Sequence, residues 1–455
     1  MCRISDNAVS AILKMGKLYE VGGAVRDKML GRDITIKDRD YLVCGIPYLD
    51  LSKILKQYGQ VDLVGKSFGV IKFTQYRKDN KYTFDLSLPR KEFSTGHGHK
   101  DFSVTFDPDL DVADDLLRRD FTINAMAVSL ETDQLIDPYG GQVDLKNKLI
   151  RMVSPNSFPE DPLRMLRAIQ FSARFEFEIE PGTYQAIIDN AELIKTVSAE
   201  RVSEELNKLL TLADRPSIGF RLMHKTGIMN RILPEMEEMV DVDQPGGYHK
   251  YDVFEHTMHT IDAAPKSLHI RLAALFHDIA KPRTRRITET KATFYGHESQ
   301  GARIAKKVLK RLRYSSDVIN KVATLTDRHM FVTGVTDKGM RRLIRKVGQD
   351  LIFDLLDLRR ADVVAQGMGG TTEDVDEFEQ NIRDEIDKKP PFSISDLELD
   401  GIEIMQMFSL KPSPIVGEIL DFLMENVLDE PAYNTKEKLT ELTHLFMKNK
   451  GNENN

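Results

Sequence analysis

Apolar and polar residues follow two different patterns along the chain, and the change falls near residue 150. Before it, short apolar or alternating runs are separated by short helical stretches and by turns such as "DPYGG". Short runs of this kind, bounded by turn residues, predict β-strands. The runs are KLYEVGG, DYLVCG, GVIKFTQY, KYTFDLSL and AMAVSL. The pattern from residue 18 to about 150 therefore predicts a small mixed sheet with helices.

After "RMVSPNSFPED" the apolar residues recur with the helical period almost throughout. Helices are predicted near residues 161–175, 183–194, 199–212, 216–227, 253–263, 268–280, 297–312 and 315–331. The polar stretch 366–377 and the "KKPPFS" break at 388–393 predict a joint before a final helical tail. The predicted fold class is α+β, with a mixed-sheet head followed by a largely helical remainder.

The length and composition indicate a multidomain protein of the cytoplasm. At 455 residues the chain is too long for one compact core, so about two to four domains are expected. The composition is 41% hydrophobic and 30% charged, with no long apolar run and no leader pattern, so we expect neither a membrane span nor secretion. Cys2 and Cys44 cannot build a disulfide framework or a thiolate zinc site, which fits a reducing compartment.

The formal net charge of -7 does not indicate a nucleic-acid binder, but the average hides local basic tracts. These tracts are KPRTRR at 281–286, KKVLKRLR at 306–313 and RRLIRK at 341–346. For any single tract a solvated helix face is the more common explanation.

The stretch from Lys17 to Gly45 combines two features of a nucleotide site. An apolar strand ends in Gly22 and Gly23 and leads into a helix, where backbone N–H groups can bind a triphosphate; Arg26 lies one turn further. Asp38 and Asp40 stand at i and i+2 on an extended segment, so both carboxylates can bind the same divalent cations. Two magnesium ions held in this way suit phosphoryl transfer.

Several motifs together give the chain a specific resemblance. "VGGAVRDKMLG" and "KDRDYLV" are followed in order by "LRRDFTINAMA", "DPYGG", "EDPLRMLRAIQFSARF" and "ERVSEELNKLL". In these motifs the chain resembles the class II tRNA nucleotidyltransferases and bacterial poly(A) polymerases. The resemblance implies a polymerase-β-like head (1–150), a helical neck (151–215), a helical body (216–370) and a helical tail (371–455).

The resemblance also implies roles for single residues. Asp38 and Asp40 would be the Mg²⁺ ligands, and Asp85 in "YTFDLSL" would stand at the position of a third carboxylate. The remaining head residues that it assigns to the nucleotide are Gly22, Gly23, Arg26, Arg119 and Asn124. The expected partners are tRNA and the substrates CTP and ATP, with no membrane partner and a monomer or homodimer as the oligomeric state.

The "EDPLRMLR" motif bears on the choice of nucleotide. Asp161 as N-cap and Pro162 at the first helical position predict a helix start, which alone would explain these residues. Asp161 and Arg164 also lie on one helix face, where a carboxylate acceptor and a guanidinium donor can match the base edges of cytosine and adenine. By resemblance Arg167 belongs to the same pocket and Glu160 orients Arg164.

A second set of residues resembles the metal-ligand order of the HD phosphohydrolase superfamily. The order is His256, then His277 and Asp278, then Asp362, with His297 and His329 as candidate ligands of a second metal. His259 lies nearby and is interpreted as supporting only. Mixed imidazole and carboxylate ligands suit manganese, nickel, iron or cobalt, and such a centre activates water against a phosphoester.

Three hypotheses follow. The first is a CCA-adding enzyme with an HD phosphohydrolase domain. The second is a relative restricted to adding CC or A, or a poly(A) polymerase; the stretch between the metal carboxylates and "LRRDFTINAM" is of full length, whereas CC-only relatives have a shortened one. The third is an HD hydrolase whose head senses nucleotides. The presence of Asp38, Asp40, Arg119, Asp161 and Arg164 argues against the third.

Overall fold

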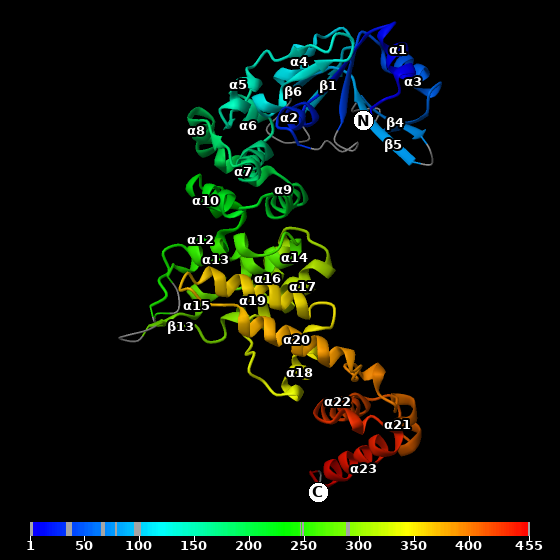
Figure 1. Cartoon of the computed structure of the whole chain (residues 1–455), viewed down its shortest axis with the longest axis vertical. Helices are drawn as coiled ribbons and strands as arrows, with labels where there is room; N and C mark the ends of the chain where they lie inside the picture. Colours follow the sequence, from blue (N-terminus) through cyan, green and yellow to red (C-terminus); the bar gives the residue numbers. More distant parts are fainter. Residues whose placement is uncertain are drawn as a thin grey trace. The chain divides into compact units, whose positions relative to one another are not determined.

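The computed structural model describes residues 3–32, 39–64, 69–77, 80–94, 102–245, 247, 250–287 and 292–453. The chain forms two compact units, residues 1–237 and 238–455 (Figure 1). The predicted four-domain division stays a prediction.

A seven-stranded mixed sheet forms the framework of the N-terminal unit, with the strand order β3-β4-β5-β2-β1-β8-β9. The β2 and β5 strands pair in parallel, and the other neighbours are antiparallel. The strands are β1 (Lys17–Val21), β2 (Asp40–Cys44), β3 (Gln60–Val64), β4 (Val70–Arg77), β5 (Asn80–Ser87), β8 (Ala127–Ser129) and β9 (Leu135–Ile136). A separate hairpin joins β6 (Arg90–Ser94) and β7 (Phe102–Phe106). The α+β class predicted from the sequence is confirmed.

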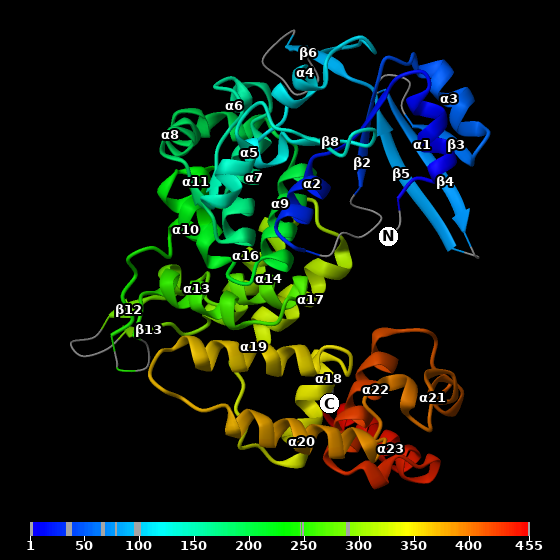
Figure 2. The same ribbon diagram turned by 45° about the horizontal axis from the view of Figure 1, so that its top comes forward.

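The two faces of the sheet bury alternate residues of β2. Tyr41 and Val43 belong to one apolar core, and Leu42 and Cys44 to the other. This alternation follows from the two-residue period of a strand. The first core is covered by α1 (Asp6–Leu13) and α3 (Tyr48–Lys56), which lie side by side in Figure 2. The second is covered by α4 (Val112–Leu117).

Short elements connect the sheet to the helices of the same unit. They are α2 (Gly23–Met29), the 3₁₀ turn η2 (Thr122–Asn124), α5 (Gly141–Lys146), α6 (Ser157–Glu160) and the parallel pair β10 (Leu149–Ile150) and β11 (Glu178–Ile179). The longer helices that follow are α7 (Leu163–Phe175), α8 (Pro181–Asn190), α9 (Ala199–Leu212) and α10 (Ser217–Lys225). The unit continues through η3 (Ala191–Thr196), α11 (Ile228–Ile232) and α12 (Pro234–Glu237).

The start of α7 differs from the prediction by one residue. Pro162 is the N-cap, and Asp161 precedes it in an extended conformation. The Asp161 carboxylate still accepts a hydrogen bond from the Leu163 N–H at 3.3 Å. Asp161 therefore continues to satisfy a donor of the first helical turn, from a position just outside the helix.

The C-terminal unit is almost entirely helical. Its first helices are α13 (Val253–Ala263), α14 (Leu268–Phe276), α15 (Lys281–Thr284), α16 (His297–Arg311), α17 (Ser316–Arg328), α18 (Asp337–Val347) and α19 (Ile352–Ala365). A two-stranded ribbon, β12 (Arg286–Ile287) and β13 (Ala292–Thr293), precedes α16. The last elements are α20 (Glu373–Asp387), η4 (Ile394–Asp396), α21 (Gly401–Phe408), α22 (Pro414–Asp429), η5 (Pro431–Tyr433) and α23 (Lys436–Glu453).

Arg341 links three of these helices. Its guanidinium is buried, donates to the Glu385 carboxylate on α20 at 2.7 Å, and donates to the Leu428 carbonyl of α22 at 2.6 Å. A buried charge that finds both a counter-ion and helix-end acceptors fixes the arrangement of α18, α20 and α22. Among the described residues, none of the helices combines the length and apolar character that a membrane crossing requires.

Candidate functional site

A cavity of about 400 Å³ in the N-terminal unit brings together residues that are far apart in the sequence. Of the residues predicted from the sequence, it is lined by Asp40, Asp85, Arg119, Asp161, Arg164 and Arg167. Its other lining residues are Val70, Ser87, Arg90, Arg118, Asp120, Leu163 and Arg201. Carboxylates of the sheet thus share one cavity with arginines of α7 and α9.

The carboxylate side of the cavity is set by strand register. Asp40 is the first residue of β2 and lies directly opposite Asp85 in the parallel pairing of β2 with β5. Residues opposite one another on neighbouring strands present their side chains to the same face of the sheet. Asp38 lies outside the described residues, so its place beside Asp40 stays a prediction.

Arg119 lies between the carboxylates and the turn at Gly22. Burial lowers the pKa of Arg119, and the carboxylates of Asp115 and Asp40 act against this shift. Gly22 has a φ of 75°, and a Cβ atom there would stand 2.5 Å from Nη1 of Arg119. Glycine is therefore required at this turn both for its backbone conformation and for the space that Arg119 occupies.

Arg26 and Asn124 are not among the residues that line this cavity. Arg26 is buried, donates to Oδ1 of Asn124 at 2.5 Å, and lies over the Phe175 ring at 4.7 Å from its centroid. The amide nitrogen of Asn124 donates in turn to Asp120 at 2.9 Å. In this conformation Arg26 holds Asn124, and Asn124 holds Asp120, which lines the cavity. Their contact with a nucleotide, like that of Gly22 and Gly23, stays a prediction.

The side chains of α7 are held by partners that the sequence did not indicate. Arg201 of α9 donates to both carboxylate oxygens of Asp161, at 3.2 and 2.8 Å. Arg164 donates to the Arg118 carbonyl at 2.7 Å and to Ser157 Oγ at 3.1 Å. Asp161 and Arg164 are therefore oriented separately within one cavity, and the carboxyl of Glu160 lies 3.6 Å from Arg164.

Asp120 is the residue of this site that sequence reasoning missed most clearly. It is buried and accepts two hydrogen bonds from Arg167, at 2.9 and 2.6 Å. Burial alone would raise the pKa of Asp120, but Arg167 and Asn124 outweigh it and the net shift is downward. Both Asp120 and Arg201 stand inside motifs that carried the family resemblance, which was the available signal.

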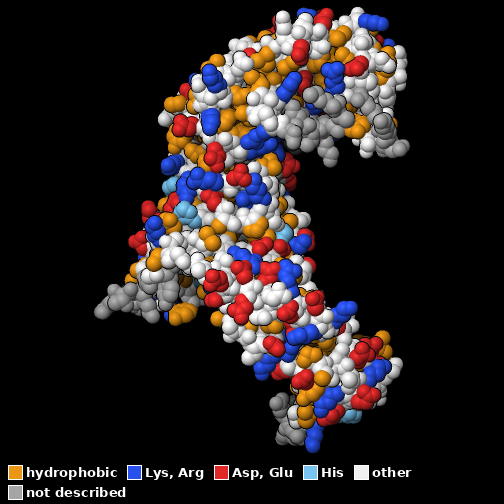
Figure 3. All heavy atoms as spheres, in the orientation of Figure 1, with side chains coloured by type: hydrophobic (Ala, Val, Ile, Leu, Met, Phe, Trp, Pro, Cys, Tyr) orange, Lys and Arg blue, Asp and Glu red, His pale blue; other side chains and the backbone are white. Residues whose placement is uncertain are grey.

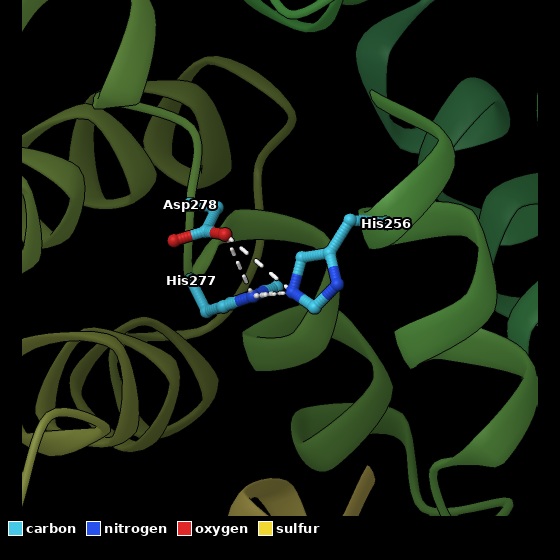
Figure 4. Close-up of side chains that lie close together, drawn as sticks. All are labelled: His256, His277 and Asp278. Carbon is cyan, nitrogen blue, oxygen red and sulfur yellow. Dashed lines mark hydrogen bonds and ion pairs between the residues drawn. The ribbon is translucent and has the colours of Figure 1, made fainter. Parts of the chain in front are cut away.

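In the C-terminal unit the six predicted HD residues form one buried cluster. Two overlapping groups have potential ligand atoms within 4.8 Å of one another: His256, His277 and Asp278, and Asp278, His297 and His329. Figure 4 shows both rings of the first group directed toward the Asp278 carboxylate. Asp362 completes the cluster, with Oδ1 3.0 Å from Nε2 of His256. Helices α13, α14, α16, α17 and α19 carry or immediately precede these residues.

The orientation of three imidazoles suits metal binding. The Nδ1 atoms of His277, His297 and His329 donate to backbone carbonyls three residues earlier, at 2.7 to 2.8 Å. Each ring therefore turns its Nε2 atom into the cluster, the arrangement in which backbone acceptors fix metal-ligating histidines. The Nε2 atoms of His297 and His329 are 3.2 Å apart. Two neutral rings would bring two lone pairs together here, and a cation between them would remove this repulsion, so the donor set fits a metal site.

Burial and charge act together on the protonation of the cluster. Burial, and then the charge of His277, lower the pKa of His329 to about 3, so its ring is neutral and able to act as a ligand. Burial would raise the pKa of Asp278, but His277 and Lys281 outweigh it and hold that pKa well below its usual range. An ionised carboxylate shared by two groups of imidazoles is the ligand that two adjacent cations require.

His259 lies outside the cluster. Its ring packs on Tyr251, with centroids 4.3 Å apart. It also lies three residues from His256 on α13. The supporting role expected from the sequence stays a prediction.

Two of the predicted basic tracts differ in whether their side chains are paired with carboxylates or exposed to solvent. In the 341–346 tract, Arg342 donates to Glu425 at 2.8 Å, and Arg345 donates to the same carboxyl group at 2.9 Å. In the 306–313 tract, Lys306, Lys307 and Lys310 are exposed on α16. On the face drawn in Figure 3, basic and acidic side chains are interspersed over the C-terminal unit.

Three family models match successive parts of the chain. They are the poly A polymerase head domain at residues 18–151, the probable RNA and SrmB-binding site of polymerase A at 176–240, and the HD domain at 248–366. The fold resembles that of the Bacillus stearothermophilus CCA-adding enzyme in complex with CTP, with a TM-score of 0.72 at 22% identity over 98% of this chain and 97% of that one. For the Thermotoga maritima CCA-adding enzyme complexed with tRNA the TM-score is 0.54 at 22% identity, over 96% and 94%.

The fold and the two sites define a class, the CCA tRNA nucleotidyltransferases that carry an HD phosphohydrolase domain. The multifunctional CCA protein of Ralstonia nicotianae is 38% identical over 312 residues, which are 66% of this chain and 69% of that protein. The multifunctional CCA protein of Burkholderia mallei is 35% identical over 342 residues, 72% and 78% of the two chains. The chain belongs to the family of multifunctional CCA proteins.

The cluster geometry predicts metal binding that depends on His277 and Asp278. The double variant His277→Ala, Asp278→Ala removes ligands from both groups, so we expect it to lose bound manganese or nickel, with affinity lowered by about 100-fold or more. Metal content after dialysis, measured by mass spectrometry, checks this. The matched control is His269→Ala on α14, a histidine outside the cluster that lies 2.7 Å from Asp354, and it should keep its metal. A folded double variant that binds metal like the wild type would contradict the assignment.

Proposed function

We propose that the head of this protein adds the complete 3′-terminal CCA to tRNA from CTP and ATP, and that its HD cluster hydrolyses phosphoesters. The observation that carries the first activity is one cavity that contains Asp40, Asp85 and Arg119 together with Asp161 and Arg164. Groups suited to metal ions, triphosphate and base are thus within reach of a single nucleotide. The HD cluster, with its inward Nε2 atoms, carries the second activity.

In the head, Asp38, Asp40 and Asp85 would hold magnesium. Magnesium ions in such a site activate the attacking hydroxyl and neutralise the leaving pyrophosphate. Arg119 lines the same cavity as Asp40 and Asp85 and can bind phosphate or sugar oxygens with its guanidinium. The backbone N–H groups at the start of α2, after Gly22, offer a further site for the triphosphate, supported by Arg26 from behind.

Base selection falls to Asp161 and Arg164. A carboxylate accepts a hydrogen bond from the exocyclic amine of cytosine or adenine, and a guanidinium donates to the adjacent ring acceptor. Uracil and guanine present an oxygen where these bases present the amine, so they are disfavoured. The bidentate bond from Arg201 supports this role, because it holds the Asp161 carboxylate in one orientation before the base arrives.

In the C-terminal unit, His256, His277, Asp278 and Asp362 would hold one transition metal, and His297 and His329 would share Asp278 around a second. The candidates are manganese, nickel, cobalt and iron. Such a metal supplies a water molecule acidic enough to attack a phosphoester at neutral pH. The 2′,3′-cyclic and 2′-phosphates are the proposed substrates.

The exposed cations of α16 support contact with the tRNA backbone. Lys306, Lys307 and Lys310 lie on the solvent side of this helix, where they can neutralise phosphates without reading bases. The 341–346 tract is less suited to this role, because Arg341, Arg342 and Arg345 are bonded to carboxylates of α20 and α22.

The addition assay offers tRNAs that end before the first C, before the second C and before the terminal A, with each nucleoside triphosphate. We expect CTP and ATP to complete all three tRNAs and extension to stop at the full CCA end. Asp38→Ala or Asp40→Ala should lower addition by about 10³-fold or more, the scale on which phosphoryl transfer depends on one charge-stabilising group, and leave tRNA binding little changed. Products ending at CC, a single added A only, or a long A tail would each contradict full CCA addition.

The same variants separate the two activities. Asp40→Ala should keep the hydrolysis of 2′,3′-cyclic phosphates, while His277→Ala, Asp278→Ala should lose hydrolysis and keep addition. An HD hydrolase with a nucleotide-sensing head would instead add no nucleotide under any condition. Melting curves identify variants that have lost both activities by unfolding.

Arg164→Ala tests base selection. Loss of the guanidinium should remove about 1–3 kcal/mol of discrimination for CTP and ATP over UTP and GTP, together with rate. Relative kcat/KM values for the four triphosphates measure this. The control is Arg174→Ala, on the same helix but away from the cavity lining. Unchanged selectivity in a folded Arg164→Ala protein would mean that the base is read elsewhere.

Salt dependence tests the tRNA contact. In the triple variant Lys306→Gln, Lys307→Gln, Lys310→Gln, each lost phosphate contact should reduce the slope of log affinity against log salt by about 1. The matched control, Arg342→Gln with Arg345→Gln, neutralises cations already bonded to carboxylates and should leave the slope unchanged. Equal slopes for the triple variant and the wild type would show that α16 is a solvated face.

A further inference from the structure

The HD cluster forms one side of a cavity of about 570 Å³, within the range of small-molecule sites. The ligand-type residues on this side are Asp278, His297, His329 and Asp362. Two cations, Lys281 and Arg359, stand next to them, and the rest of the lining combines an apolar wall with Gln244, Thr293, Gly296, Glu298 and Gln366. The apolar side is formed by Pro245, Ala292, Phe294, Tyr295 and Met330. A site that served only to bind metal and water would not need this volume or this wall.

The two cations are held differently. Lys281 is buried, 2.7 Å from the Asp278 carboxylate and 2.6 Å from Oε1 of Gln244, so its charge is already matched. Arg359 is partly exposed, and within the described part of the chain it bonds to Asp362 alone, through Nη1 at 2.8 Å. A guanidinium carries five N–H donors in a planar fork. Arg359 can therefore hold Asp362 and at the same time bind an anion in the cavity.

The apolar wall is tied to the ligands in sequence as well as in space. Tyr295 stands two residues before His297, and Met330 follows His329 directly. Their exposed fractions are 83% for Tyr295 and 59% for Met330. Gly296, with a φ of 78°, makes the turn between Tyr295 and α16. The position of the Tyr295 ring is thereby linked to that of His297.

An exposed aromatic ring that shares a cavity with a cation and a metal-type cluster suits a ligand with a phosphate at one end and a planar group at the other. Phosphate oxygens match a guanidinium, and a nucleobase stacks on tyrosine whatever its identity. A bare phosphoester would leave Tyr295 and Met330 as exposed as they are in the free protein, whereas a planar group would gain free energy in proportion to the apolar area that it covers.

We propose that this cavity is a nucleoside-phosphate subsite, in which Arg359 binds the phosphoryl oxygens and Tyr295 stacks on the base. The proposal rests on the hydrolytic function proposed for the HD cluster and assigns its substrate-selecting residues. A free mononucleotide and the end of an RNA chain carry the same chemistry, so both belong to the test.

The hydrolysis arm compares adenosine 2′-monophosphate, an RNA oligonucleotide with a 2′,3′-cyclic phosphate end, and glycerol 2-phosphate, which has no base. Tyr295→Ala should lower kcat/KM for the better of the two nucleotide substrates by about 5- to 150-fold, the scale of one stacked base, and leave glycerol 2-phosphate unchanged. Arg359→Gln should lower all three, and Arg359→Lys should restore part of the loss. The better nucleotide substrate identifies the source of the ligand.

A binding arm is independent of turnover. Adenosine and inorganic phosphate are titrated separately into the metal-loaded full-length protein. Tyr295→Ala should weaken adenosine only, and Arg359→Gln should weaken phosphate only. The matched controls are Tyr433→Ala in η5 and Arg360→Gln, the next residue on α19, which is bonded to Asp376 and Glu379.

Metal content and melting temperature of each variant exclude loss of the cluster or of the fold. Equal effects of Tyr295→Ala on nucleotide and glycerol 2-phosphate, or unchanged adenosine binding, would overturn the proposal. If the wild type binds adenosine and phosphate as expected but hydrolyses nothing, the hydrolytic function fails and the subsite stands.

Discussion

A buried carboxylate that must remain paired organises the head of this protein. Asp120 receives two hydrogen bonds from Arg167 of α7 and one from Asn124, which in turn accepts from Arg26 of α2. An unpaired charge at this depth would cost several kcal/mol, so α7 and α2 are fixed relative to the sheet. The same constraint fixes Asp161 and Arg164, at the start of α7, relative to Asp40. The pairing of Asp120 thus sets the distance between the carboxylate side of the cavity, with Asp40, and the base-selecting side, with Asp161 and Arg164.

In the HD cluster, by contrast, the buried polar groups are not all paired with one another within the described part of the protein. Its imidazole Nε2 atoms lie 3.2 to 3.3 Å apart, within hydrogen-bond distance, but two neutral rings that donate through Nδ1 have no Nε2 proton to share. The Nδ1 atoms are satisfied by backbone carbonyls, which leaves the Nε2 atoms of His277, His297 and His329 directed into the cluster, toward the shared Asp278 carboxylate. The free energy of metal binding then compensates for the cost of burying these groups, and so couples the metal to the packing of the helices that carry them.

The described residues of the two sites lie within separate compact units, and this supports two activities that share a chain and not a mechanism. Their surroundings also differ. The head cavity is lined mainly by charged side chains, as a site for a triphosphate requires. The HD cavity adds an apolar wall with Tyr295 and Met330. This contrast is the physical basis for expecting different parts of a nucleotide to dominate recognition at each site.

The sequence by itself determined the element types and the chemistry of the sites. The helices near 199–212 and 253–263 agree with α9 and α13, and all six HD residues meet in one cluster. Local periodicity and the types of possible ligand can be identified from short stretches of residues. The family motifs gave the order of the ligands along the chain. Only the tertiary structure decided which partners the charged side chains take. Arg26 donates to Asn124, which is 98 positions away in the sequence, and is buried by this contact. Arg341 donates to Leu428, 87 positions away, and Arg342 and Arg345 of the same tract bond to Glu425. Such pairings depend on which helices and strands pack together, and no local pattern encodes them.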